Sequence, residues 1–300
     1  MRRLSGFLAS ALIFLVHYAA LSQTGPVSLD RFDLKQRLYL LDEGGRILVS
    51  DNRQPDKPAK TLVTVPSNLK ALDILTTKLW GDRELLFVTA YGLTSGDSRP
   101  RLMQYSGAGE RQCEWILPEI SAGLDVDTGR HVVYLAGNMT GTVYSLALLK
   151  DTCYGPRQLN PVLKIAGGGR LGPLVVDSRR RLAFVGDGLR GSIYRIILDR
   201  GEHAEIAGSL GQPVALLFDD STGHLYAADS TGRRIWLIDV NRATIPTPTP
   251  RVLSRDPAFQ EPACLTFASN GGLVVGDRRA KRIFLMDLAG HITQQVAMPE

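Results

Sequence analysis

The chain has 300 residues, of which 44% are hydrophobic, 22% are charged and only 7% are aromatic. This composition is typical of an ordinary globular protein with enough apolar material for a large core. The formal net charge of +5 falls to about +3 without the two arginines at positions 2 and 3, which is too mildly basic to predict a nucleic-acid ligand.

The first 22 residues predict a secretory signal peptide. Two arginines open the chain, an apolar stretch covers residues 7–21, and a small-x-small site ends at Ser22. The apolar stretch is shorter than the roughly 20 residues that a transmembrane helix needs. An uncleaved membrane anchor stays open as the alternative, because His17 and Tyr18 weaken the stretch. We expect a secreted or periplasmic protein whose mature domain is residues 23–300.

Six similar units follow one another from about residue 26. Each consists of short runs rich in Val, Ile, Leu, Tyr and Phe, separated by Gly, Asp, Asn and Ser, which predicts strands rather than helices. The first residue of the second run recurs every 43 to 49 residues, at Leu38, Leu86, Val133, Leu182, Leu225 and Leu273. In the fifth unit we expect strands over residues 214–218, 225–228, 234–239 and 251–254.

Four strands at this spacing predict an all-β fold, a six-bladed β-propeller of four-stranded antiparallel blades. The first unit contains its own fourth strand near residues 61–65, and the last unit contains one near residues 292–298. We therefore expect the ring to close without exchange of a strand between the first and last blades.

The fifth unit, VALLFDDSTGHLYAADSTGRRIWLID, resembles the NHL repeat. The likeness is good in the last four units and loose in the first two. The wider group is the six-bladed propellers that include the SMP-30/gluconolactonase-like proteins. No unit carries the Trp-Asp dipeptide of WD40 repeats or the paired glycines of kelch repeats. The resemblance implies that the first strand of each blade lines the axis. It also implies that the loops before this strand share one face, the ligand face, with the loops between the second and third strands.

Several polar residues on this face are candidate ligand contacts. The second unit has an unusually long loop over residues 91–100, which contains Tyr91, and we expect it to stand above the channel mouth. A neutral surface insertion is the alternative. Basic side chains would draw anionic ligands or form a solvated rim. The candidate contacts are Tyr91, Asn68, Gln212, Glu261, Arg190, Arg233 and Arg278.

Three of these loops begin with an aspartate, namely Asp187, Asp229 and Asp277, and Asn138 stands at the fourth place. A ring of ligand or cation contacts is one interpretation. We favour turn chemistry, in which the side chain accepts hydrogen bonds from nearby backbone N–H groups.

On the axis, Asp30, Asp73 and Asp125 follow aligned leucines of the first three blades. Three carboxylates at one level could hold a single divalent cation such as Ca²⁺. The alternative is that they accept hydrogen bonds from backbone N–H groups or channel water. The resemblance to the lactonases implies an axial cation held by a Glu, an Asn and an Asp. This chain lacks a matching set, so no catalytic residue carries over.

The chain has three cysteines, none of them in a C-x-x-C pair, and no zinc site is predicted. Cys113 and Cys153 fall near the outer edges of neighbouring units, and in an oxidising compartment they could form a disulfide. Cys264 lies inside a predicted strand and is expected to be a small buried residue.

Two functions from different classes follow. The first is an exported, monomeric, non-enzymatic module that binds a small molecule or a protein on its loop face. The second is a metal-dependent hydrolase of the lactonase kind. The sequence has no nucleophile elbow, phosphate-binding glycine loop or histidine acid–base pair that would favour an enzyme.

Overall fold

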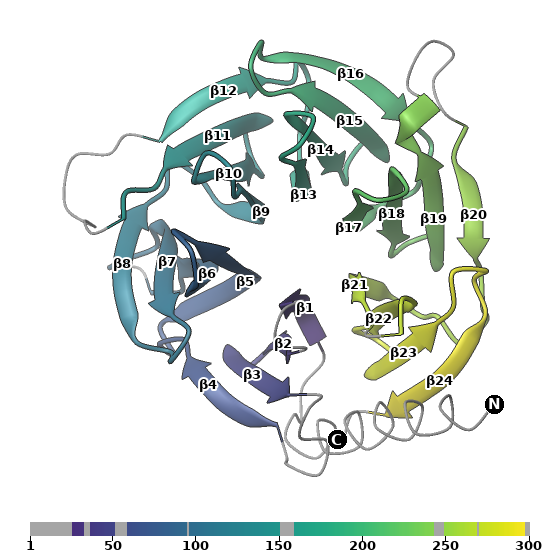
Figure 1. The fold of residues 1–300 in the computed structure, drawn as a ribbon, viewed down its shortest axis with the longest axis horizontal. Helices are drawn as coiled ribbons and strands as arrows, with labels where there is room; N and C mark the ends of the chain where they lie inside the picture. Colours follow the sequence, from purple (N-terminus) through teal and green to yellow (C-terminus); the bar gives the residue numbers. More distant parts are fainter. Residues whose placement is uncertain are drawn as a thin grey trace.

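The structure is a computed structural model that describes residues 26–32, 37–51, 59–94, 96–150, 159–242, 249–268 and 270–297. In these ranges, six four-stranded antiparallel sheets stand around a central axis (Figure 1). The predicted signal peptide lies outside the described residues. Among the residues described, no helix is both long enough and apolar enough to cross a membrane.

Each blade takes its four strands in chain order, from the axis to the rim (Figure 1). Blade 1 contains β1 (Pro26–Phe32), β2 (Arg37–Asp42), β3 (Arg46–Asp51) and β4 (Lys60–Thr64), and blade 2 contains β5 (Leu69–Leu79), β6 (Arg83–Gly92), β7 (Pro100–Ser106) and β8 (Arg111–Ile116). Blade 3 contains β9 (Ser121–Asp127), β10 (Val132–Gly137), β11 (Thr142–Ala147) and β12 (Asn160–Lys164), and blade 4 contains β13 (Leu171–Asp177), β14 (Leu182–Asp187), β15 (Ser192–Ile197) and β16 (Glu202–Ala207). Blade 5 contains β17 (Pro213–Asp219), β18 (His224–Asp229), β19 (Arg234–Asp239), the 3-10 turn η1 (Val240–Arg242) and β20 (Arg251–Ser254), and blade 6 contains β21 (Pro262–Phe267), β22 (Leu273–Asp277), β23 (Arg282–Met286) and β24 (Ile292–Ala297).

The burial of each strand explains its sequence pattern. The second strand of a blade is flanked by strands on both sides and covered by two neighbouring blades, so β18 reads HLYAAD and is buried after its first residue. The rim strand β8 has one face in solvent, and its RQCEWI alternates between exposed and buried positions. The position of a strand within its blade, inner or at the rim, therefore decides whether its sequence is continuously apolar or alternates between apolar and polar residues.

Apolar side chains from adjacent blades interlock to hold the ring together. At the seam between the first and last blades, Leu40 and Leu48 of blade 1 pack in one buried cluster with Val274, Ile283 and Leu285 of blade 6. Blade 1 and blade 6 each consist of four consecutive strands, which confirms the expectation that no strand is exchanged. Packing of this kind closes the ring.

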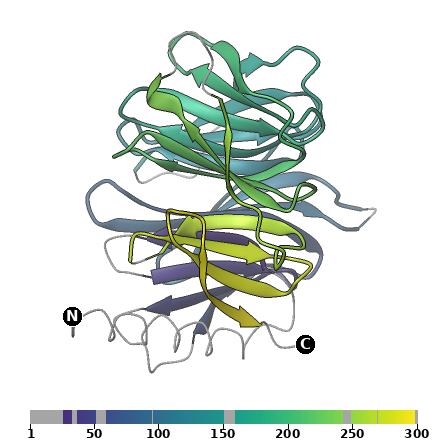
Figure 2. The same ribbon diagram turned by 90° about the vertical axis from the view of Figure 1, so that its right-hand side faces the viewer.

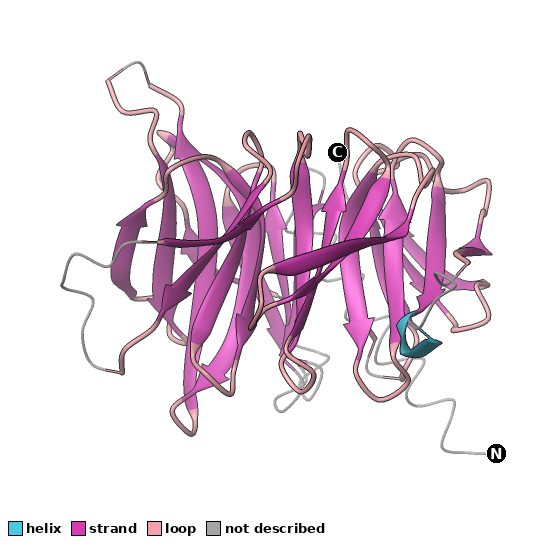
Figure 3. Cartoon of the chain, turned by 90° about the horizontal axis from the view of Figure 1, so that it is seen from above, coloured by secondary structure: helices cyan, strands magenta, loops and turns pink. Residues whose placement is uncertain are grey.

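The long segment predicted over residues 91–100 is strand at its two ends, where β6 finishes at Gly92 and β7 begins at Pro100. Tyr91 belongs to β6 and pairs with Lys70 on one side and Pro100 on the other. The connection that remains, residues 93–99, is longer than the corresponding connections of blades 3 and 4, residues 138–141 and 188–191, and it projects from one face of the disc, at the right of Figure 2. Figure 3 shows the same disc edge-on, with the loops gathered on its two faces.

Candidate functional site: the mouth and walls of the central channel

A cavity of about 650 Å³ occupies the centre of the ring. Binding pockets for small molecules have volumes of roughly 300–1,000 Å³. The first strands of blades 2 to 6 supply most of its wall. Polar side chains lie at the loop end, and they come from Glu43, Lys70, Asn138, Arg170, Gln212 and Arg278. The cavity therefore has a polar mouth and a wall built on rigid strands.

One backbone hydrogen bond recurs at the mouth of blades 2 to 6. In each blade, a backbone N–H just after the second strand donates to the carbonyl of the residue that stands shortly before the first strand. The pairs are Leu93 to Asn68, Asn138 to Ile120, Gly188 to Arg170, Ser230 to Gln212 and Arg278 to Glu261, at 2.8, 2.8, 3.0, 3.1 and 3.0 Å. We call these five acceptor residues the mouth positions. The bond places the two sets of loops on one face, as the resemblance implied.

Two of the seven predicted ligand contacts line the cavity, namely Gln212 and Arg278. Arg278 donates to Glu261 Oε1 at 3.0 Å, so the charges of that pair largely offset one another. Gln212 accepts a hydrogen bond from the Ser230 hydroxyl at 3.3 Å through Oε1, so its amide nitrogen remains available as a donor. Blade 5 therefore presents an amide donor at the mouth.

The other predicted contacts lie outside the cavity lining. Arg190 donates to the Ala166 carbonyl at 3.2 Å and to the Tyr194 hydroxyl at 3.4 Å. Arg233 is exposed in the turn between β18 and β19. Asn68 is exposed, and Tyr91 is part of the β6 ladder. The described residues of the β6–β7 connection contribute nothing to the lining, and that this loop stands above the mouth stays a prediction.

The aspartates at the start of the loops accept hydrogen bonds from nearby backbone N–H groups, as favoured from the sequence. Asp187, Asp229 and Asp277 are fully buried. Asp277 accepts from the backbone N–H groups of Gln260, Glu261 and Ala280 at 2.8, 2.9 and 2.8 Å. Burial by itself raises the pKa of Asp229, but hydrogen bonds from Gly232, Gln212 and Arg234 outweigh it and hold that pKa below its ordinary value.

In blade 3, a different residue supplies the carboxylate that holds the loop after the second strand. The counterpart of these aspartates is Gly137, not Asn138, because Gly137 pairs with Ser121 as Asp187 pairs with Leu171. The carboxylate comes instead from Glu119, which is 6% exposed and lies where a side chain on Gly137 would be.

Glu119 accepts hydrogen bonds from four donors. They are the Met139 N–H at 2.6 Å, the Thr140 N–H at 2.9 Å, the Tyr144 hydroxyl at 2.8 Å and the Thr140 hydroxyl. Burial raises the pKa of Glu119, but these bonds more than offset it and lower that pKa overall.

The axial aspartates do not share one level. β5 pairs Ile74 with Val88, and β9 pairs Leu124 with Leu135. Val88 and Leu135 occupy the same place in the repeat, so Ile74, rather than Leu72, is the counterpart of Leu124. From this level the β5–β6 ladder continues to the pair of Leu79 with Arg83, two residue pairs further than the β9–β10 ladder, which ends at the pair of Asp127 with Val132, and this longer hairpin causes the shift. The alignment that put Asp73 beside Asp125 is therefore wrong by two residues, or about 6–7 Å along a strand.

Asp73 and Asp125 connect adjacent blades. Asp73 accepts from its own strand at Ile74 N, at 2.9 Å, and from Leu124 N of blade 3 at 3.3 Å. Asp125 does the same at Val126 N and at Val176 N of blade 4, at 2.7 Å in both cases. These bonds match the alternative interpretation, in which the carboxylates accept from backbone N–H groups.

The described residues do not fit an axial cation site. No three His, Cys, Asp or Glu side chains in the described part of the chain come together in a way that could hold a metal ion. The strand level of Asp30 matches that of Asp125, but the side chain of Asp30 is outside the description. The axial cation stays a prediction that rests on sequence alone.

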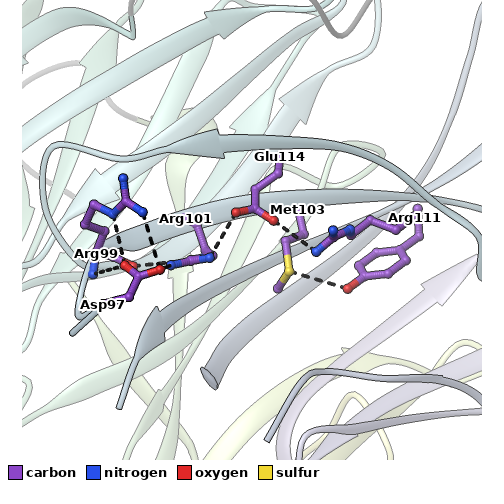
Figure 4. Close-up of polar contacts among 7 residues, drawn as sticks. Asp97, Arg99, Arg101, Met103, Arg111 and Glu114 are labelled. Atoms are coloured by element: carbon purple, nitrogen blue, oxygen red, sulfur yellow. Dashed lines mark hydrogen bonds and ion pairs between the residues drawn. The ribbon is translucent and has the colours of Figure 1, made fainter. Parts of the chain in front are cut away.

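The β6–β7 connection is held by charged groups at the rim of blade 2 (Figure 4). Asp97 pairs with Arg99 at 2.9 Å and with Arg101 at 2.6 Å, and Arg101 pairs with Glu114 at 3.0 Å. Hydrogen bonds from Arg99 and Arg101 hold the pKa of Asp97 far below its ordinary value. Arg111 completes the row through Glu114, at 3.1 Å. This network anchors the connection to its own blade.

The cysteines fall into two classes. Cys113 is buried and disulfide-bonded, while its predicted partner Cys153 lies outside the described residues. Cys264 is free and buried in β21, as expected, and burial raises the pKa of its thiol to about 12.

Sequence reasoning missed Arg170, Lys70 and Glu43 as lining residues, and it favoured turn chemistry for Asn138, which also lines the cavity. Arg170 left a usable signal, because it stands at the mouth position of blade 4, where Gln212 stands in blade 5.

Comparisons with known proteins agree on the fold. Residues 174–300 match the sequence model of a family described as "SMP-30/Gluconolactonase/LRE-like region". No curated protein sequence matches the chain. The NHL assignment of the repeat stays a prediction.

Solved structures with the same fold have low sequence identity. A chain of a nidogen/laminin complex superposes with a TM-score of 0.66 at 16% identity, over 87% of this chain and 92% of that one. Virginiamycin B lyase from Staphylococcus aureus gives 0.62 at 13% identity, over 93% and 86%. A streptogramin B lyase gives 0.65 at 13% identity, over 94% and 85%. At this level of identity, the likeness concerns architecture alone.

Proposed function

We propose that this chain, a six-bladed propeller of the SMP-30/gluconolactonase-like superfamily, is a non-enzymatic module that binds a small ligand in its central channel. The ligand enters from the face that carries the mouth positions. The observation that carries the proposal is the cavity of about 650 Å³, with polar groups at its mouth and mainly aliphatic walls. Such a combination buries an apolar body and orients it through a few polar contacts.

The positions of the histidines support binding over catalysis. One of the virginiamycin B lyase structures is of a catalytically inactive variant in which alanine replaces a histidine, which ties activity in that protein to a histidine. In this chain the described histidines are engaged away from the channel. The ring of His131 contacts that of Trp80, His203 and His224 contact tyrosine rings, and His291 pairs with Asp287. The channel wall is left with carboxylates that bond to backbone N–H groups.

Export is part of the same proposal. The signal-peptide pattern of residues 1–22 supports it, and so does the disulfide at Cys113, because disulfides persist in oxidising compartments. The intact mass of the protein recovered from an exporting host should correspond to a chain that begins at Gln23.

A channel-blocking variant tests the binding site. A Cβ added to Gly172 would meet no atom within 4 Å, and this residue lines the cavity. Gly172→Phe should therefore fill the channel without disturbing the blades, and Gly172→Ala is the matched control. Native mass spectrometry after incubation with a metabolite extract should show a small-molecule adduct on the wild type and on Gly172→Ala only. An adduct that persists on Gly172→Phe would place the site elsewhere.

A protein partner on the same face is the second candidate within the binding class. Three exposed apolar side chains project from the loops of blades 2 to 4, namely Leu93, Met139 and Leu189, which are 56%, 69% and 68% exposed. If a protein covers them, Met139→Ser and Leu189→Ser should weaken its binding. Gly172→Phe should leave that binding unchanged, because its side chain lies inside the channel.

The family match favours a metal-dependent hydrolase as the alternative outside that class. The test is hydrolysis of lactones and aryl esters with and without Ca²⁺, comparing the wild type with Asp125→Asn. Turnover that needs both the cation and Asp125 would replace the binding proposal.

A further inference from the structure

We infer that the channel selects a ligand with an apolar body and a terminal oxyanion, whose head group is held by Arg170 and Gln212. This inference rests on the proposed function and names the chemistry of its ligand. It follows from three features, which are the positions of the two side chains, their hydrogen-bond partners and the wall beneath them.

Arg170 and Gln212 occupy equivalent mouth positions on adjacent blades. Their carbonyls accept the recurring bond from Gly188 N and Ser230 N, at 3.0 and 3.1 Å, so both backbones are fixed at the same height. The side chain of Gln212 lies against Gly188, since a Cβ on Gly188 would come within 3.4 Å of its Cγ and 3.7 Å of its Nε2. The Gln212 amide is therefore directed toward blade 4, the blade that carries Arg170.

The hydrogen-bond partners leave donors available at this point. Among the described residues, Arg170 has no side-chain hydrogen bond or ion pair, although it lines the cavity. Gln212 uses its Oε1 for Ser230, which leaves the two N–H groups of its amide. Other cations at the mouth are engaged, because Arg278 pairs with Glu261 at 3.0 Å and Lys70 reaches the Glu43 carbonyl at 3.5 Å. The donors on blades 4 and 5 match the oxygens of a carboxylate or phosphate.

The wall below these donors is apolar. Blades 4 and 5 line the cavity with Pro173, Val175, Val214, Ala215 and Leu217. Of the carboxylates that line the cavity, Glu43 and Asp73 stand on blades 1 and 2, and Asp125 of blade 3 bonds to Val176 N near the far end of β13 from Arg170. An oxyanion at Arg170 is thereby separated from Asp125 by most of the length of a strand, and its apolar body covers aliphatic wall.

The test uses four probes with one apolar body and different head groups. Octanoate, octyl phosphate, octanol and octylammonium are titrated by calorimetry into the full-length mature protein. Both oxyanions should bind at least tenfold more tightly than octanol, and octylammonium more weakly than octanol. The ratio of octanoate to octyl phosphate affinity then tells which oxyanion the site prefers. Equal binding of octylammonium and octanoate, or no binding of any oxyanion probe, overturns the inference.

Variants assign the effect to named side chains. Arg170→Gln should remove the preference for the oxyanions while leaving octanol affinity unchanged. Arg170→Lys should retain only part of the preference, because it keeps the charge but loses the paired donors. Arg233→Gln is the matched control, an exposed arginine on a loop of the same face outside the cavity, and should behave as the wild type. A preference that survives Arg170→Gln overturns the assignment.

The channel-blocking variant separates this inference from the proposed function. Gly172→Phe should abolish binding of all four probes. If the probes bind wild type alike and Gly172→Phe abolishes that binding, the channel site stands and the oxyanion selectivity is wrong. If the probes bind the blocked variant as well as the wild type, the channel site itself is wrong.

Discussion

Removal of the Glu119 carboxylate should destabilise blade 3 by about 2–4 kcal/mol. Glu119 accepts four hydrogen bonds, two of them from backbone N–H groups of the loop that follows β10. A hydrogen bond to a charged group contributes about 1.5–3 kcal/mol. The hydroxyls of Thr140 and Tyr144 can turn to other acceptors, and water reaches part of the exposed loop. Counting only the two N–H groups, at about 1–2 kcal/mol each, gives the stated range for Glu119→Ala.

A substitution at Gly137 tests whether Glu119 takes the place of the aspartate found in the other blades. An aspartate there would restore the residue that blades 1, 4, 5 and 6 have, but its Cβ would overlap the Glu119 carboxylate and would lie 2.8 Å from the Thr142 carbonyl oxygen. Gly137→Asp alone should therefore be destabilising. In Glu119→Ala the side-chain overlap is gone and a carboxylate is supplied again. The double variant should lose at least about 1 kcal/mol less than the sum of the single losses.

Urea unfolding followed by circular dichroism measures all four proteins of this cycle. Glu119→Ala should also lower the melting temperature by roughly 5–10 °C, since 1 kcal/mol corresponds to about 2–4 °C in a domain of this size class. Additive losses in the cycle would refute the claim that Glu119 replaces the missing aspartate. A loss below about 0.5 kcal/mol for Glu119→Ala would refute its role in holding the loop.

Three further predictions concern the axis, pH and the thiols. Asp125→Asn keeps one carbonyl oxygen and should lose one of the two bonds at 2.7 Å, at a cost of about 1–2 kcal/mol in urea unfolding; a rise in melting temperature with Ca²⁺ that this variant abolishes would instead establish the axial cation. The pKa of Asp229 is lower in the folded protein than its unfolded value of about 3.8, so the carboxylate stabilises the fold above that pH and loses this effect as pH falls through the folded pKa. The difference in unfolding free energy between wild type and Asp229→Asn should therefore shrink, and should not grow, in urea titrations at acid pH. Iodoacetamide at pH 8 should leave Cys264 unmodified in the folded protein and modify it in denaturant, since burial raises its pKa to about 12, and labelling at equal rates in both states would contradict that burial.

The sequence was sufficient to predict the architecture, because strand spacing, turn residues and apolar periodicity all recur six times. In the fifth unit, the expected strands over residues 234–239 and 251–254 coincide with β19 and β20. Such signals are local, and each unit repeats the same information. The order of strands within a blade follows directly once the repeat is recognised.

The errors arise where a side chain or a register depends on a neighbouring strand. The β5–β6 hairpin extends two residue pairs further than the β9–β10 hairpin, which places Asp73 two positions away from Asp125, and nothing in the local pattern around Leu72 reveals it. In blade 3, Gly137 stands where other blades have an aspartate, and the carboxylate comes from Glu119, which precedes the first strand. An alignment of the loops alone therefore places Asn138 at the aspartate position, which is wrong. Tyr91 resembles a loop residue in the sequence, because the paired region of β6 and β7 is longer than in the other blades and its end contains polar and glycine residues. Contacts between strands decide each case.

The seam between blades 1 and 6 makes this ring a candidate for circular permutation. Every blade is a contiguous stretch of chain, and the first and last blades meet through the buried cluster that includes Leu40 and Ile283. A linker that joins Ala297 to Pro26, with new ends opened between β8 and β9, would leave all six sheets whole. The chain termini can then be placed at any seam between two blades. A set of such permuted variants would allow the stability of each seam to be measured in turn.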